Sequence, residues 1–158
     1  MSTAPALEIH PADLADPRVI RLLEDHLADM YATSPPESVH ALDIGGLSVA
    51  EVAFWTIGEG DDLLGCVALK ELDGAHGELK SMRTDAAARG RGLGARLLEH
   101  VLVEAGRRGY ARLSLETGSE EFFRPARTLY AKYGFRECEP FADYVPDPNS
   151  VFMTLELR

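Results

Sequence analysis

The sequence has 158 residues, of which 46% are hydrophobic and 27% are charged, proportions typical of one folded soluble domain and not of a disordered chain. No apolar run approaches the roughly 18 residues that a membrane-spanning helix needs, and the N-terminus lacks the basic and apolar regions of a signal peptide. The net charge of −10 disfavours binding to nucleic acid or to an anionic membrane. We therefore expect one cytoplasmic domain over residues 1–158, with no nucleic-acid or membrane partner.

Charge is distributed unevenly along the chain. Fifteen of the 26 acidic residues, but only four of the 16 basic ones, lie in residues 1–80. This predicts an acidic half that attracts a cation and an Arg-rich half that binds an anion, although solubilising surface charge explains the pattern equally well. Cys66 and Cys138 match neither a metal-ligand spacing nor a redox pair, so we expect two free thiols and no metal.

The first half of the chain predicts a strand, a helix and three further strands. The strand covers residues 6–10, and the helix starts at Pro17 behind Asp16 as its N-cap. Pro- and Ser-rich residues 31–42 predict a loop. Three antiparallel strands are then expected, the first two joined through a Gly-containing turn, at residues 50–58, 62–72 and 78–84.

The second half begins with an amphipathic helix that starts near Leu93 and ends at Gly109. A strand, a helix and a final strand follow at residues 111–117, 125–135 and 150–157. This order of elements implies an α/β domain with one mixed, mostly antiparallel central sheet of about six to seven strands, flanked by helices.

A glycine- and arginine-rich stretch, ARGRGLGARLLEH at residues 88–100, lies where the amphipathic helix begins. It lacks the GxxxxGK[ST] of a Walker loop. It does match the dinucleotide-binding motif GxGxxA, at Gly90, Gly92 and Ala95. That motif expects an acidic residue about 20 positions further on, and Glu116 would be this residue. Only 64 residues follow Gly94, however, too few for the paired halves of a dinucleotide fold. Counted from Arg89, the stretch is RxxGxG.

Two motifs resemble one known family. The RxxGxG motif stands in the order strand, turn, long helix, strand, helix, and A-x-x-L-Y-x-x-x-GF follows from Ala126 to Phe135. Over residues 77–136 this combination is similar to the GNAT family of N-acetyltransferases. The segments GCVALKELDGAHGELKSMRT and CEPFADYVPDPNSVFMTLEL further resemble its bacterial branch of YsnE-type, indole-acetic-acid-associated acetyltransferases.

The resemblance implies the single-domain GNAT fold and acetyl-CoA as cosubstrate. Unpaired backbone N–H groups at a helix start favour an anion, and glycines let a pyrophosphate approach. In the family the preceding strand pairs its backbone with the pantetheine arm. By position, the cofactor-binding residues would be Met82, Arg83, Thr84, Arg89, Gly90, Arg91, Gly92, Leu93, Gly94 and Ala95.

Two residues are carried over as catalytic. Tyr130 matches the family tyrosine that protonates the departing thiolate, and Glu78 aligns with the glutamate that some members use as general base. A buried core aromatic remains the alternative for Tyr130. A charge on the sheet surface remains the alternative for Glu78.

The acceptor side is expected at about residues 17–58, beside the cofactor-binding core. Candidate substrate contacts, each open to a purely structural explanation, are His26, Glu37, Ser38, His40, Trp55 and Glu116. Residues 141–149 are too rich in Pro and Asp for a simple strand, and a lid near the acceptor is one interpretation.

We expect an N-acetyltransferase that moves an acetyl group to a small-molecule primary amine by direct attack in a ternary complex. The alternatives are a protein lysine or N-terminal acetyltransferase and a non-catalytic acyl-CoA-binding sensor. A homodimer is left open.

Overall fold

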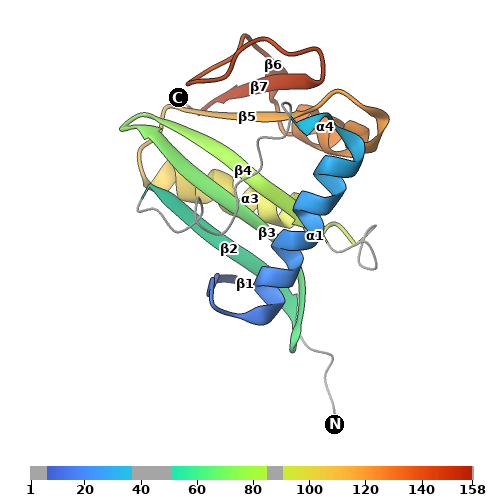
Figure 1. Ribbon diagram of the computed structural model, residues 1–158. Helices are drawn as coiled ribbons and strands as arrows, with labels where there is room; N and C mark the ends of the chain where they lie inside the picture. The colour runs from blue at the N-terminus through green and yellow to red at the C-terminus, as the bar shows by residue number, and fades with distance from the viewer. Residues whose placement is uncertain (1–6, 37–50, 85–90, 158) are drawn as a thin grey trace.

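The computed structural model describes residues 7–36, 51–84 and 91–157, which form one α/β unit (Figure 1). Its elements in chain order are β1 (Leu7–Pro11), α1 (Pro17–Thr33), β2 (Val52–Glu59), β3 (Asp62–Asp73), β4 (His76–Thr84), α3 (Leu93–Arg107), β5 (Arg112–Gly118), the short 3₁₀ helix η3 (Glu121–Phe123), α4 (Arg124–Lys132), β6 (Arg136–Glu137) and β7 (Ser150–Glu156). The predicted single sheet with flanking helices is confirmed.

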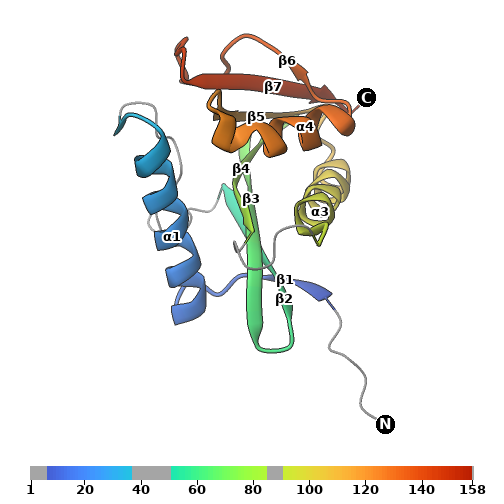
Figure 2. The ribbon, with the colours of Figure 1, turned by 90° about the vertical axis from the view of Figure 1, so that its right-hand side faces the viewer.

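All seven strands belong to one sheet, in the order β1-β2-β3-β4-β5-β7-β6. Only β4 and β5 pair in parallel, and the other neighbours are antiparallel. Helix α1 covers one face of the sheet, and α3 and α4 cover the other (Figure 2). Within the described parts of the chain, no helix has the length and apolar character needed to cross a membrane.

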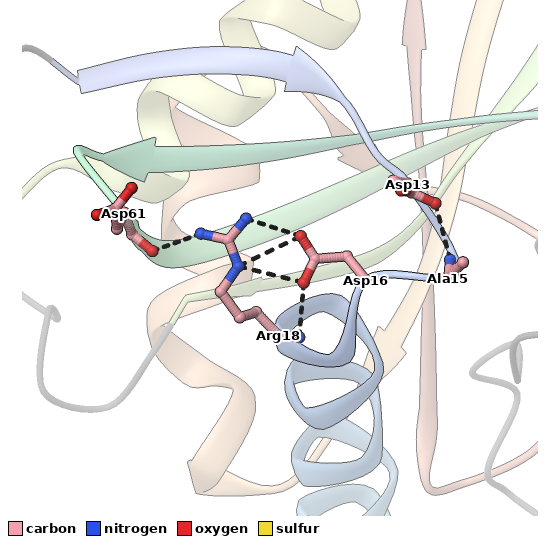
Figure 3. A network of polar contacts seen from close by, with 5 residues as sticks. All are labelled: Asp13, Ala15, Asp16, Arg18 and Asp61. Atoms are coloured by element: carbon pink, nitrogen blue, oxygen red, sulfur yellow. Dashed lines mark hydrogen bonds and ion pairs between the residues drawn. The ribbon is translucent and has the colours of Figure 1, made fainter.

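The start of α1 is fixed by the residues that the sequence predicts. The Asp16 carboxylate accepts a hydrogen bond of 2.9 Å from the Arg18 backbone N–H, which caps the first turn. The Arg18 guanidinium binds the same carboxylate and also the Asp61 backbone oxygen in the β2–β3 turn, while Asp13 accepts from the Ala15 N–H (Figure 3). The helix start is therefore tied to the neighbouring hairpin.

Two glycines lie at the ends of a strand and of a helix, as the sequence predicts. Gly60, with φ of 61°, lies in the two-residue turn between β2 and β3. Gly109, with φ of 78°, follows α3, and the N–H groups of Gly109 and Tyr110 donate to the carbonyls of Gly106 and Ala105. This pair of bonds is the Schellman arrangement, which satisfies the last helical carbonyls.

The structure departs from the predicted elements at three places. Strand β4 starts at His76, two residues before the predicted start, and α4 ends at Lys132 because Gly134, with φ of 98°, terminates it. Strand β6 was not predicted, since its two residues carry no pattern of their own. It exists through pairing with β7, where Arg136 lies opposite Thr154.

Candidate active site

Strands β4 and β5 separate in the middle of the sheet and leave a gap between them. Their pairing runs from His76 opposite Arg112 to Leu79 opposite Leu115, and both strands then continue without pairing to each other. Figure 1 shows them side by side at the start of β4 and apart toward its end. Ser81, with φ of 54°, lies in a register irregularity between β3 and β4 that redirects β4 at this point. The unpaired strand edges leave room for an extended ligand.

Helix α3 begins near this gap with an uncapped N-terminus. Its N-cap is Gly92, with φ of 74°, and among the described residues no side-chain cap hydrogen bond reaches the first turn. A Cβ at Gly92 would contact nothing within 4 Å, so the backbone is approachable there. A Cβ at Gly94 would lie 3.2 Å from Leu129, so the absence of a side chain there lets α3 pack closely against α4.

The other predicted cofactor residues differ in where they lie. The backbone of Met82 and Thr84 borders the gap, while the Leu93 side chain is buried in the core beneath α3. The half-exposed Arg91 forms a 2.6 Å ion pair with Glu59 at the end of β2. Ala95 belongs to the first turn of α3, and Arg89 and Gly90 lie outside the described residues.

One pocket joins the gap to both faces of the sheet, and we call it the site pocket. It is bordered by β4 and β5, by α1 on one face and α4 on the other, and by the segment before β7. Its lining includes His26, Met30, Glu78, Lys80, Met82, Glu116, Thr117, Phe123, Ala126, Tyr130 and Tyr144. It therefore unites both predicted catalytic residues with two predicted substrate contacts, His26 and Glu116.

Glu78 is buried and firmly held in the site pocket. Its Oε2 accepts a hydrogen bond of 2.6 Å from the Tyr144 hydroxyl and lies 3.1 Å from Lys80 Nζ. Lys80 Nζ is also 2.8 Å from the Tyr144 hydroxyl, so the three groups form a closed triangle. Burial, and then the negative charge of Glu78, raise the pKa of Tyr144 above its ordinary value. Glu78 is thus an ion-pair partner and not a bare surface charge.

Glu116 is the second carboxylate of the site pocket and follows Leu115, the last residue of β5 that pairs with β4. Burial raises the pKa of Glu116 to about 7; the Ser150 hydroxyl and the Lys80 ammonium oppose this rise, and the Glu78 and Asp147 charges reinforce it. Tyr130 is fully buried on α4. Burial, and then the charge of Glu116, raise the pKa of Tyr130 above its ordinary value, which keeps the phenol protonated at neutral pH.

The α1 side of the site contains a further buried group. Arg83 NH1 binds the Asp29 carboxylate of α1, while Arg83 Nε is buried and has no hydrogen-bond partner among the residues that the structure describes. Burial, and then the Arg83 charge, lower the pKa of His26 to about 4, so His26 is neutral at physiological pH. His26 can accept or donate a hydrogen bond there but carries no charge.

The structure does not bring Trp55 to the site pocket. Its ring packs edge-on against His100 of α3, at 4.8 Å between centroids, on the face opposite α1. Neighbouring Phe54 belongs to the α1-side cluster, because successive strand residues point to opposite faces. The predicted contacts Glu37, Ser38 and His40 lie outside the described residues.

Two site residues were not predicted. Lys80 is not among the residues predicted for the site, and Tyr144 lies within the segment 141–149, for which a lid was one interpretation. The Tyr144 hydroxyl meets residues 64 and 66 positions earlier in the chain. Among the described residues, no group of three or more His, Cys, Asp and Glu side chains is arranged to hold a metal ion.

The acetyltransferase (GNAT) family model matches residues 19–135. The chain belongs to this family. It is 55% identical over 145 residues to the uncharacterized N-acetyltransferase YsnE of Bacillus subtilis, covering 92% of this chain and 96% of that protein. It is 49% identical to the uncharacterized N-acetyltransferase YedL of Escherichia coli, covering 92% and 91%, and 39% identical to the IAA acetyltransferase of Azospirillum brasilense, covering 85% and 88%. The resemblance to the GNAT family and its YsnE-type branch is confirmed, and with it the prediction of an acyltransferase.

Solved structures share the fold. A Klebsiella pneumoniae protein assigned as an acyl-CoA N-acyltransferase is 28% identical, with a TM-score of 0.78 over 96% of this chain and 98% of that one. A GNAT acetyltransferase of Elizabethkingia anophelis with acetyl-CoA bound is 20% identical, with a TM-score of 0.69 over 95% of this chain and 97% of that one.

Proposed function

We propose that this protein is an acetyl-CoA-dependent N-acetyltransferase that acetylates the primary amine of a small molecule by direct attack in a ternary complex. The observation that carries the proposal is the gap between β4 and β5. It leads from the uncapped start of α3 to a pocket that holds a buried phenol and a carboxylate of raised pKa.

The residues around the gap fit acetyl-CoA. The N–H groups at the start of α3 would receive the pyrophosphate, with Gly92 allowing close approach. The edge of β4 at Met82, Arg83 and Thr84 that does not pair with β5 would pair with the pantetheine amides, as an added strand does. When bound, acetyl-CoA supplies the acetyl thioester. Arg89, Gly90 and Arg91 remain predicted phosphate contacts.

Glu116 is the better candidate for the general base. An amine of pKa near 10 arrives as an ammonium and must lose a proton before its nitrogen can form a bond. Glu78, the base predicted from the sequence, is already engaged by Lys80 and Tyr144. The pKa of about 7 at Glu116 suits proton acceptance near neutral pH.

Tyr130 is proposed as the general acid. It lies on α4, on the opposite face of the sheet from α1, and lines the same pocket as Glu116. As the carbon–sulfur bond breaks, Tyr130 donates its hydroxyl proton to the leaving sulfur. The nitrogen that has formed the new bond to the acetyl carbon carries one excess proton, and Tyr130 regains its proton from that nitrogen, so one proton in total is released through Glu116.

A thiol-release screen tests this function. Purified protein is incubated with acetyl-CoA and panels of small primary amines, lysine peptides and N-terminal peptides. We expect thiol release with small amines that depends on both substrates. Release with peptides alone would overturn the small-molecule acceptor. Binding of acetyl-CoA without thiol release from any panel would indicate the non-catalytic sensor instead.

A further inference from the structure

The α1-facing side of the site holds two buried cations. The side chains of Lys80 and Arg83 are 8% and 10% exposed. Each is paired with one carboxylate, Glu78 for Lys80 and Asp29 for Arg83. Buried charges persist when they are paired, so these two pairs are close to neutral as they stand. Glu116 is the remaining carboxylate of the site pocket.

The Arg83 guanidinium is incompletely bonded. Its Nε is buried without a partner in the described part of the chain, and a guanidinium cannot lose its proton to relieve this. Arg83 borders a cleft that continues from the site pocket along α1, where Met30, Phe122 and Phe123 form apolar walls. A ligand carboxylate in this cleft would lie beside the Arg83 guanidinium, which borders it.

The backbone and the side chain of Arg83 serve different sides of the sheet. Its backbone lies at the edge that faces β5, whereas its side chain reaches Asp29 on α1. Its register partner on β3, Cys66, belongs to the core cluster beneath α1. The neighbouring Met82 side chain packs on the opposite face, with α3 and α4. The Arg83 side chain, paired with Asp29, therefore lies on the acceptor side, while its backbone lies on the donor side.

We propose that the acceptor is an amino carboxylate, whose carboxylate binds Arg83 while its ammonium lies beside Glu116. This inference rests on the proposed function. The two ion pairs of the site are close to neutral, and a zwitterion adds one positive and one negative charge. Its carboxylate would meet the Arg83 guanidinium, and its ammonium would meet the Glu116 carboxylate. An amine without a carboxylate would place no acceptor oxygen beside the Arg83 guanidinium at the cleft. Met30 and Phe123 border both the site pocket and the cleft, so an apolar body fits between the two ends.

Acceptor pairs that differ only in the carboxylate test the inference. Thiol release from acetyl-CoA is measured with the twenty standard L-amino acids and with the carboxamide of each. We expect kcat/KM of the best amino acid to exceed that of its carboxamide by about tenfold or more, as expected for a hydrogen bond to a charged group. Equal or better use of the carboxamides would overturn the inference, and so would turnover of peptides alone. Failure of acetyl-CoA to bind at all would instead refute the proposed function.

Variants of Arg83 test whether this residue causes the preference for amino acids over their carboxamides. In Arg83→Gln the ratio of kcat/KM between amino acid and carboxamide should fall to about one, and in Arg83→Lys it should be intermediate. The matched control is Arg136→Gln, since Arg136 is an exposed arginine on β6. Thermal unfolding verifies that each variant is folded. A preference that survives unchanged in Arg83→Gln would overturn the assignment of Arg83 as the carboxylate-binding residue.

Discussion

Replacing Glu116 by Gln should inactivate the enzyme and stabilise it. The folded protein holds the Glu116 proton up to pH of about 7, whereas the unfolded chain releases it near the ordinary pKa of 4.5. Between pH 4.5 and about 7, folding therefore takes up a proton at Glu116. The contribution of Glu116 to the free energy of unfolding falls progressively as the pH rises through this range. Gln has the shape of the protonated acid but does not titrate.

The expected size follows from the two pKa values. The difference between 4.5 and about 7 corresponds to about 3 kcal/mol at most, at roughly 1.4 kcal/mol for each pKa unit. Because Glu116 retains some solvent contact, we expect Glu116→Gln to gain about 1–3 kcal/mol in the free energy of unfolding at pH 8 and close to nothing at pH 4.5. Loss of a general base should lower kcat by about 100-fold or more.

Urea unfolding of the wild type and Glu116→Gln across pH 4.5–8, together with thiol-release kinetics, measures both effects. In the wild type, kcat should rise as pH increases through about 7, since only the ionised carboxylate accepts a proton. The control is Glu78→Gln, which breaks the contacts with Lys80 and Tyr144 and should destabilise the protein. A stability difference that does not vary with pH, or a variant of Glu116 with full turnover, would refute the reasoning.

Three further substitutions follow from the same geometry. Tyr130→Phe should keep the affinity for acetyl-CoA, by calorimetry, but lose about 100-fold in kcat; unchanged turnover would remove Tyr130 from the mechanism. Lys80→Met should move the midpoint of the pH–rate profile above that of the wild type, because the Lys80 charge lowers the pKa of the proposed base; an unmoved midpoint would contradict this. Gly77→Ala should lose about 1–3 kcal/mol in urea unfolding, because its Cβ would lie 2.7 Å from the Tyr110 ring. Gly74→Ala, whose Cβ would contact nothing within 4 Å, is the matched control, and equal effects of the two would count against the packing argument.

Most of the fold could be predicted because its elements carry local signals. The cap at Asp16, the turn at Gly60 and the end of α3 at Gly109 all act within a few residues of their own position. Strand β6 carries no such signal, since its pairing with β7 is what defines it. The same holds for the register irregularity at Ser81, which depends on how β4 meets β3.

The catalytic residues of the site were predictable where a motif marks them. Tyr130 and Glu78 follow from matches to a family pattern, and the structure brings them into one pocket. The role of Tyr144 could not be found from periodicity, because its hydroxyl reaches Glu78 across 66 positions in the chain. That Trp55 does not line the site pocket could not be foreseen, because the sequence does not say which face of the sheet α1 covers.

The central claim is that the gap between β4 and β5 receives acetyl-CoA. Calorimetric titration of acetyl-CoA into the purified protein tests it directly, without knowledge of the acceptor. We expect saturable binding of one acetyl-CoA per chain, weakened in Gly92→Ala because the left-handed N-cap position disfavours a side chain. Absence of binding at millimolar acetyl-CoA would contradict the account.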